Sequence, residues 1–239
     1  MQVDEEVGRL VVVSDLHGFT EPLGMLDGII AAYPERVQVV AAGDYVASGL
    51  EPAETVEWVR RNAGQFAVIG NHDEGAITRA EGEHPPWTER GSSQRLSPEQ
   101  REYLSELPDS LDLFWKGRLI RITHGRISSG EWINWLASED EVFEAFADPS
   151  VALTITAHTH YPFVRRNEGG CLANSGATSY LVLGMKGDDG TMRSRTEGPP
   201  EPVPSIYSSY LCVTADGADL EVAVERFDYD REKEIRGLL

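Results

Sequence analysis

The sequence has 239 residues, which is enough for one large domain or two small ones with a substantial hydrophobic core. Acidic residues outnumber basic residues by 40 to 21, and the formal net charge is −19. This charge argues against broad binding of nucleic acid, although bound cations could still attract a phosphate locally. The sequence has no signal-peptide core and no apolar run near the ~20 residues of a membrane span, so we expect a cytoplasmic protein without membrane contact.

Five segments share one pattern, in which a β-branched or apolar run ends abruptly in small and polar residues. They begin at Arg9, Arg36, Gln65, Arg118 and Val151. The first three runs are nearly continuous in Val, Ile and Ala, as is typical of strands buried on both faces. Segments 21–33 and 51–63 carry helical patterns between them. The first half therefore predicts alternating strands and helices, with right-handed crossovers and a largely parallel sheet.

The second half is less regular but contains clear start and stop signals. Ser97 is a good N-cap, Pro98 fits the first helical position, and Pro108 ends the predicted helix. Two hairpins are expected, one turning at Lys116–Gly117 and the closing one at Asp216–Gly217.

A short amphipathic helix is expected at 139–149, before the strand that begins at Val151. Segments 74–97 and 186–204 are rich in Gly, Pro and charge, and we expect surface or substrate-proximal loops there. No linker clearly divides the chain, so residues 1–239 are expected to form a single α/β domain.

Polar side chains follow the ends of all five predicted strands, where ligand sites of open α/β sheets lie. These residues are Asp15, His17, Asp44, Asn71, His72, His124, His158 and His160. Of the six histidines, only His84 falls elsewhere. Imidazole and carboxylate groups together suit Zn, Mn and Fe, and an amide oxygen suits harder ions. The sequence therefore predicts a metal site at these strand ends.

The spacing within two of the motifs also indicates how their side chains point. Alternate residues of an extended chain face the same way. We therefore expect Asp15 and His17 to point at one ion, and His158 and His160 to point into one site.

These motifs, taken in order, carry a resemblance to a known family. They read "SDLHG", "AAGDYV", "IGNHDE", "ITHG" and "TAHTHYP". The set resembles the calcineurin-like metallophosphoesterases, which are marked by D-x-H, G-D, G-N-H-D/E, a lone His and G-H-x-H. The motifs span nearly the whole chain. The resemblance implies a four-layer α/β/β/α sandwich with two mixed β-sheets.

The resemblance also implies a role for each residue of the set. One ion would be held by Asp15, His17 and His160, and the other by Asn71, His124 and His158, with Asp44 as the bridge. His72 would be the general acid beside the scissile phosphate, and a hydroxide shared by the ions would attack phosphorus. The ions would be Mn, Fe, Zn or Ni, with Mn or Fe favoured.

The sequence departs from the family pattern at three positions. Ala157 stands where the family usually has Gly. In the serine/threonine protein phosphatases, G-D-Y-V-D-R-G carries an Asp that supports the catalytic His and an Arg that grips phosphate. Ala47 and Ser48 replace them here. We therefore expect Asp73 or a backbone carbonyl to orient His72.

The stretch "CLANSGATSY" resembles the N-P-G-S block of small bacterial phosphodiesterases, with Ser175 in the Pro position. This favours a phosphatase or phosphodiesterase acting on a small or nucleotide-like phosphoester. Asn71, His72 and Arg126 are candidate substrate contacts, although a surface role suits Arg126 equally well. Trp132 suits a core position better than stacking on a base. The alternatives are a serine/threonine-type protein phosphatase, a dinucleoside polyphosphate hydrolase and, less favoured, a binding scaffold without catalysis.

Overall fold

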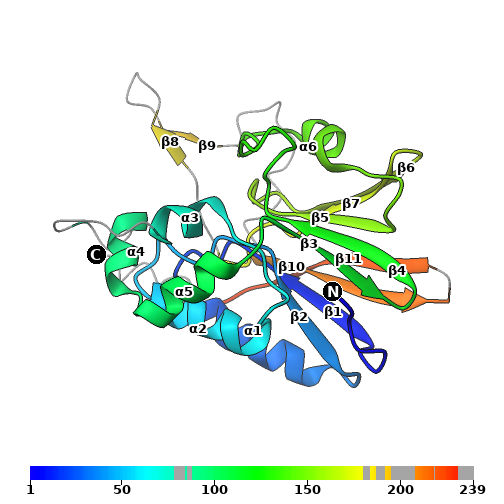
Figure 1. Ribbon diagram of the computed structural model, residues 1–239, viewed down its shortest axis with the longest axis horizontal. Helices are drawn as coiled ribbons and strands as arrows, with labels where there is room; N and C mark the ends of the chain where they lie inside the picture. The colour runs from blue at the N-terminus through cyan, green and yellow to red at the C-terminus, as the bar shows by residue number, and fades with distance from the viewer. Residues whose placement is uncertain are drawn as a thin grey trace.

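A computed structural model describes residues 1–77, 84, 88–179, 184–186, 192–194, 208–217 and 219–230. Two β-sheets pack against each other, and helices lie on the outer side of each sheet (Figure 1). Each sheet contains both parallel and antiparallel neighbours. The expected α/β/β/α sandwich with two mixed sheets is therefore confirmed.

The first sheet combines strands from the N-terminal part of the chain with strands from its C-terminal part. Its strands are β1 (Arg9–Val13), β2 (Val37–Ala41), β10 (Ser208–Asp216) and β11 (Asp219–Phe227), in the order β11-β10-β1-β2. Strands β1 and β2 are parallel, whereas β10 runs antiparallel to both β1 and β11. The closing hairpin pairs in full register, as its turn signal predicted.

Helices α1 (Glu21–Ala32), α2 (Pro52–Asn62) and α5 (Pro98–Glu106) cover the outer face of this sheet. A proline lies in the first turn of each helix, where its missing N–H leaves no hydrogen bond unmade. Trp58 Nε1 donates to Asp27 Oδ1 at 2.8 Å and joins α2 to α1. Together with the buried side chains beneath them, these helices hold β1 and β2 in place.

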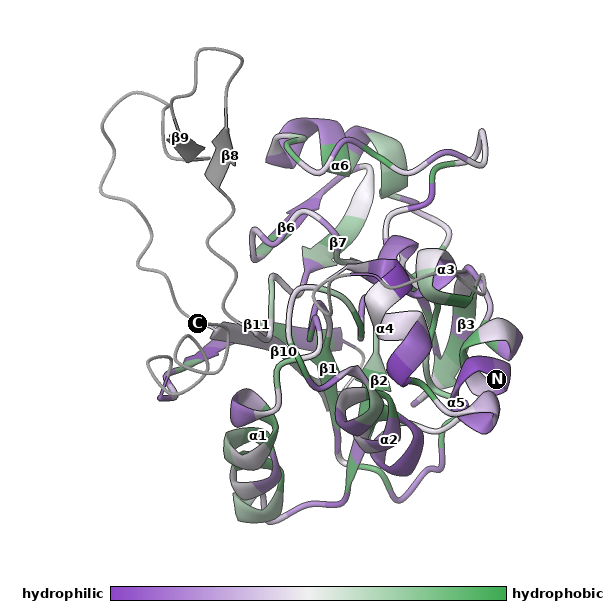
Figure 2. Ribbon diagram, turned by 90° about the vertical axis from the view of Figure 1, so that its left-hand side faces the viewer, coloured by the Kyte–Doolittle hydropathy of each residue, from purple (hydrophilic) through white to green (hydrophobic). Residues whose placement is uncertain are grey.

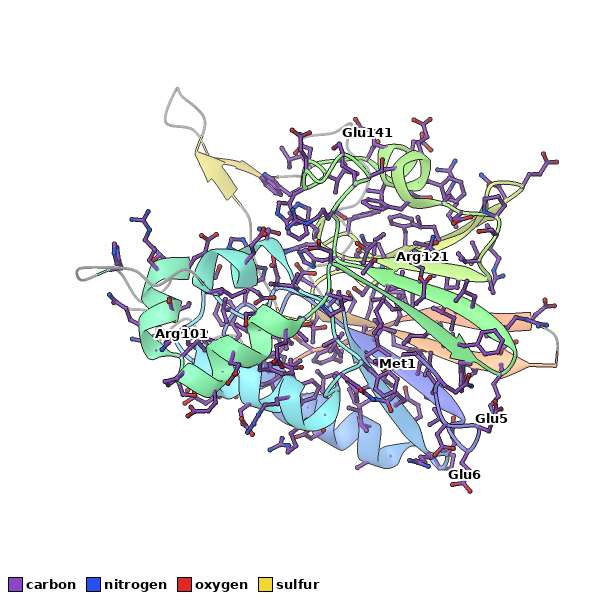
Figure 3. All side chains as sticks on the ribbon, in the orientation of Figure 1. Met1, Glu5, Glu6, Arg101, Arg121 and Glu141 are labelled. Carbon is purple, nitrogen blue, oxygen red and sulfur yellow. The ribbon has the colours of Figure 1, made fainter. Side chains whose placement is uncertain are left out.

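The second sheet contains β3 (Ser110–Trp115), β4 (Arg118–Thr123), β5 (Leu153–Thr156), β6 (Phe163–Asn167) and β7 (Gly170–Asn174). Their order is β3-β4-β5-β7-β6. Helix α6 (Glu139–Phe146) covers the outer face and packs Phe143 against Phe163 and Leu172. Figure 3 shows Glu141 on α6 and Arg101 on α5, on opposite sides of the molecule.

The main core lies between the two sheets. Val12 and Val40 of the first sheet and Ile122 and Ile155 of the second belong to one fully buried cluster. In Figure 2, β1 and β2 are drawn largely in the hydrophobic colour. Because each such side chain contributes roughly 1.5–3 kcal/mol on burial, the strand ends rest on a rigid base.

The structure differs from the expectation at the third predicted strand. Ala67 makes one isolated bridge to Ala41 and no named strand forms there. Pairing ends after Val68, whose N–H donates to Ala41 O: Gly70 N, the next amide on that side of the chain, donates to Asp73 Oδ2 at 3.0 Å instead of to β2.

The two predicted loops also contain regular elements. Within 74–97 lie the end of α3 (Asn71–Ile77) and all of α4 (Glu89–Arg95), while 78–83 and 85–87 fall outside the described residues. Strands β8 (Gly184–Lys186) and β9 (Met192–Ser194) pair around the second loop, of which 187–191 and 195–204 lie outside the described residues. Among the described helices, none combines the length and apolar character that crossing a membrane requires.

Candidate metal centre

The predicted ligands come from separate elements and meet at one end of the sandwich. Among the described residues, three groups of side chains place their ligand atoms within 4.8 Å of one another. These groups are Asp15/His17/His160, His17/Asp44/His72 and Asp44/His124/His158. Since His17 and Asp44 each belong to two groups, the three groups form one continuous cluster.

The first half of the cluster surrounds the Asp15 carboxylate, which is fully buried. Asp15 Oδ1 lies 2.9 Å from His160 Nε2 and 3.7 Å from His17 Nε2. The two imidazole nitrogens are themselves 3.2 Å apart. Ser14 Oγ donates to Asp15 Oδ2 at 2.7 Å and fixes the other side of the carboxylate. Oδ1 is therefore turned toward both histidines.

The second half of the cluster surrounds Asp44. Asp44 Oδ2 lies 3.2 Å from His124 Nε2, 3.9 Å from His17 Nε2 and 4.0 Å from His72 Nε2. Asp44 Oδ1 accepts a hydrogen bond from the His72 amide at 2.9 Å. Asn71 Oδ1 lies 3.2 Å from His124 Nε2 and brings the amide oxygen into the same half. Asp44 therefore stands between the two halves.

Backbone carbonyls fix two of the imidazole rings from outside. His124 Nδ1 lies 2.7 Å from Ala42 O, and His158 Nε2 lies 2.9 Å from Ile133 O. Each of these nitrogens donates its proton outward, so the other nitrogen of each ring is the one that can serve as a ligand once it carries no proton. The Trp132 ring packs against both imidazoles, with centroid distances of 5.7 and 6.0 Å.

The backbone at the cluster is strained. Five of the seven predicted ligands, Asp15, His17, Asp44, His158 and His160, have φ between 51° and 68°. This left-handed conformation is uncommon for residues other than glycine and costs roughly 1–3 kcal/mol each. Such strain is typical of functional sites.

A glycine gives Asp44 the room that it needs. A Cβ at Gly70 would lie 2.1 Å from Asp44 Oδ1 and 2.3 Å from Asp44 N. Because the second of these atoms is backbone, a rotation of the side chain could not relieve the contact. Gly70 therefore permits the close approach that sets Asp44 in the cluster.

Burial and charge set the protonation of the imidazoles. Burial lowers the pKa of His17 to about 3 and the pKa of His158 to about 4, so both rings are neutral at pH 7. Burial would also lower the pKa of His124, but the charge of Asp44 and its hydrogen bond raise it to about 9. A cation that used His124 Nε2 as a ligand would therefore displace a proton.

The residues present fit transition-metal ions. Asp15 Oδ1 is buried without a hydrogen bond, although the Nε2 atoms of His160 and His17 lie 2.9 and 3.7 Å from it. A cation between these atoms would satisfy the carboxylate and the nitrogen lone pairs together. Carboxylate, imidazole and amide oxygen in one set suit Mn, Fe, Zn or Ni.

The Asp73 carboxylate contacts backbone amides and not the imidazole of His72. Its Oδ1 accepts from the amides of Tyr45 and Val46, and its Oδ2 accepts from those of Asp44 and Gly70, at 2.8–3.3 Å. Burial and the charge of Asp44 raise the pKa of Asp73 to about 7, against the lowering effect of these amides. Asp73 therefore braces the loop that carries Asp44 and does not orient the His72 imidazole as predicted.

The Nδ1 side of the His72 ring faces Glu89, a residue that the sequence did not indicate. Glu89 Oε1 lies 3.0 Å from His72 Nδ1. Burial lowers the pKa of His72, but Glu89 and the charge of Asp44 raise it to about 9. Helix α4, which carries Glu89, was expected to be part of a loop.

Arg126 has three partners within the protein. Its guanidinium donates to Asp109, to Glu74 and to the carbonyl of Gly130 at 2.8–2.9 Å, and it lies 4.1 Å from the Trp132 ring centroid. These contacts support a bracing role next to the cluster. A phosphate contact by Arg126 stays a prediction.

Comparison with known proteins identifies the family of this chain. Residues 9–187 match the family model described as the calcineurin-like phosphoesterase superfamily domain, and the chain belongs to this superfamily. It is 25% identical to the uncharacterized protein MJ0912 of Methanocaldococcus jannaschii over 94% of this chain and 89% of that protein.

Two solved structures share the fold. A metallophosphoesterase from Sphaerobacter thermophilus is 23% identical with a TM-score of 0.69, over 97% of this chain and 92% of that one. The hypothetical protein PH1004 from Pyrococcus horikoshii is 16% identical with a TM-score of 0.67, over 100% and 92% of the two chains.

Proposed function

We propose that this protein hydrolyses phosphomonoesters or phosphodiesters with a dinuclear metal centre. The observation that carries this proposal is the buried Asp44 carboxylate, whose Oδ2 lies 3.9 Å from His17 Nε2 and 3.2 Å from His124 Nε2. Asp15, His17 and His160 would hold one ion, and Asn71, His124 and His158 the other, with Asp44 shared. Mn or Fe is the favoured metal, and the substrate is a small or nucleotide-like phosphoester.

Bound in this centre, two ions would supply a nucleophilic hydroxide at neutral pH and neutralise charge on the phosphate. His72 would supply the proton that the leaving oxygen needs. Its side chain is 34% exposed, so a substrate can reach it, and its Nε2 lies on the Asp44 side of the ring. The amide N–H₂ of Asn71 would donate to a phosphate oxygen.

The strained backbone favours an enzyme over a binding scaffold. A scaffold would gain nothing from five left-handed ligand residues or from the buried Asp15 Oδ1 that lacks a hydrogen bond. The protein phosphatase and dinucleoside polyphosphate alternatives are less favoured, because their phosphate-binding Arg corresponds to Ser48 here.

His72→Ala is expected to slow hydrolysis by on the order of 10²-fold or more for phenyl phosphate, and much less for p-nitrophenyl phosphate. The phenolate is the poorer leaving group and depends more on a proton donor. Steady-state kinetics on the metal-loaded protein measure both rates, with chelator-treated protein as the inactive control. Equal slowing of the two esters would contradict the general-acid role.

A further inference from the structure

His72 has a carboxylate partner on the side of its ring that faces away from Asp44. Glu89 Oε1 lies 3.0 Å from His72 Nδ1, while His72 Nε2 lies 4.0 Å from Asp44 Oδ2. The Glu89 contact has the distance of an ion pair without the alignment of a good hydrogen bond. His72 Nδ1 is otherwise buried without a hydrogen-bond partner. Glu89 is therefore the group that this nitrogen faces.

A glycine on the same helix as His72 makes room for this carboxylate. A Cβ on Gly75 would lie 2.3 Å from Glu89 Oε2 and 2.6 Å from Glu89 Cδ. Gly75 follows His72 by three residues in α3, so the two residues lie on one face of the helix. Any larger residue at position 75 would displace the carboxylate from the ring.

Helix α4 holds Glu89 in this place through contacts of its own. Thr88 caps the helix by accepting from Gly91 N at 3.1 Å. Ser92 Oγ accepts from Ala47 N at 3.1 Å. Arg101 Nη1 donates to Ser93 O at 2.9 Å and ties α4 to α5. The helix is thus bonded to the chain at Ala47, the position at which the sequence lacks a carboxylate for His72.

We infer that Glu89 is the positioning residue for His72, which rests on the proposed general-acid function of that histidine. The Glu89 carboxylate pairs with the Nδ1 side of the ring across 3.0 Å, and this restrains the ring so that Nε2 faces the reacting phosphate. During turnover the Nε2 proton passes to the leaving oxygen as the P–O bond breaks, and the proton on Nδ1 stays on the ring. Helix α4 supplies from a distant segment the carboxylate that position 47 does not.

Four variants test this role. Glu89→Gln removes the charge, Gly75→Ala displaces the carboxylate without removing it, and Glu89→Asp tests rescue. Exposed Glu102→Gln on α5 is the matched control. We expect Glu89→Gln to slow phenyl phosphate hydrolysis on the order of 10–100-fold and p-nitrophenyl phosphate only a few-fold. Gly75→Ala should do the same to a smaller extent, Glu89→Asp should retain part of the rate, and Glu102→Gln should change neither rate.

A double-mutant cycle separates this inference from the proposed function. If Glu89 acts through His72, Glu89→Gln should add no further loss on top of His72→Ala. If His72→Ala slows the two esters unequally but Glu89→Gln slows them equally, only the inference about Glu89 is wrong. If His72→Ala slows them equally, the general-acid proposal is wrong instead.

A second measurement does not depend on activity. NMR of protein with ¹⁵N-labelled histidine should show a downfield His72 Nδ1–H signal in the wild type and in Glu102→Gln. The signal should be lost in Glu89→Gln and shifted upfield in Gly75→Ala. A signal that is unchanged in Glu89→Gln would overturn the assignment of Glu89.

Discussion

Asp44→Asn is expected to lower turnover of phosphoesters by more than about 1000-fold, because it removes the charge that two ions would share. The substitution keeps the size of the side chain. It replaces an anionic oxygen that faces three imidazole nitrogens with a neutral amide. Bound metal should fall from two ions per chain to one or none, because neither half of the centre keeps its full charge.

Steady-state kinetics and elemental analysis of the same sample measure this prediction. Asp140→Asn on the exposed first turn of α6 is the matched control and should keep both metal and activity. Thermal unfolding of the metal-free variants shows whether the fold is retained. An Asp44→Asn protein that kept two ions and its turnover would contradict the bridging role.

Asp73→Ala is expected to destabilise the metal-free protein by about 3–5 kcal/mol, the largest effect on folding among these variants. The carboxylate is fully buried and accepts hydrogen bonds from four backbone amides. Alanine leaves these amides buried without acceptors, and the loop that carries Asp44 loses its brace. Urea unfolding of the chelator-treated protein isolates this effect from the stabilisation that bound metal adds.

The control for this measurement is exposed Glu102→Ala, whose effect should stay within about 0.5 kcal/mol. The urea dependence of the unfolding free energy should be the same in both variants, so that the midpoints report stability alone. A loss below about 1 kcal/mol for Asp73→Ala would mean that water or other groups satisfy the freed amides.

The fold could be predicted where the pattern was long and uniform. The continuous Val runs of β1 and β2 and the proline-started helices between and after them came out as expected. The strand predicted from Gln65 did not form, because strand pairing depends on tertiary contacts. Val68 N still bonds to Ala41 O, but Gly70 N bonds to the Asp73 carboxylate, so pairing with β2 ends there.

The sequence could predict that the candidate metal-binding residues come together, but it could not predict their backbone conformation. The expectation that Asp15 and His17 align because the chain is extended was wrong in its reason, since both residues have left-handed φ. The side chains still approach within 3.7 Å. At Ala157, in contrast, the backbone is less unusual than the family pattern suggests. It has no positive φ, so the fold does not need the glycine that the family has there.

The contact between His72 and Glu89 could not be predicted from the sequence, for a different reason. Asp73 lies next to it in the chain, but backbone amides occupy its carboxylate. Glu89 lies 17 positions after His72, in a segment whose composition indicates a loop. The packing of α4, which bonds to Ala47 through Ser92 and to α5 through Ser93, brings the two side chains together.

Anomalous diffraction from crystals of the Mn-loaded protein tests the dinuclear centre most directly. We expect two peaks, one beside Asp15 and His160 and the other beside Asn71 and His158, with the Asp44 carboxylate between them. A single peak away from Asp44, or no peak among these residues in metal-loaded crystals, would contradict the dinuclear centre.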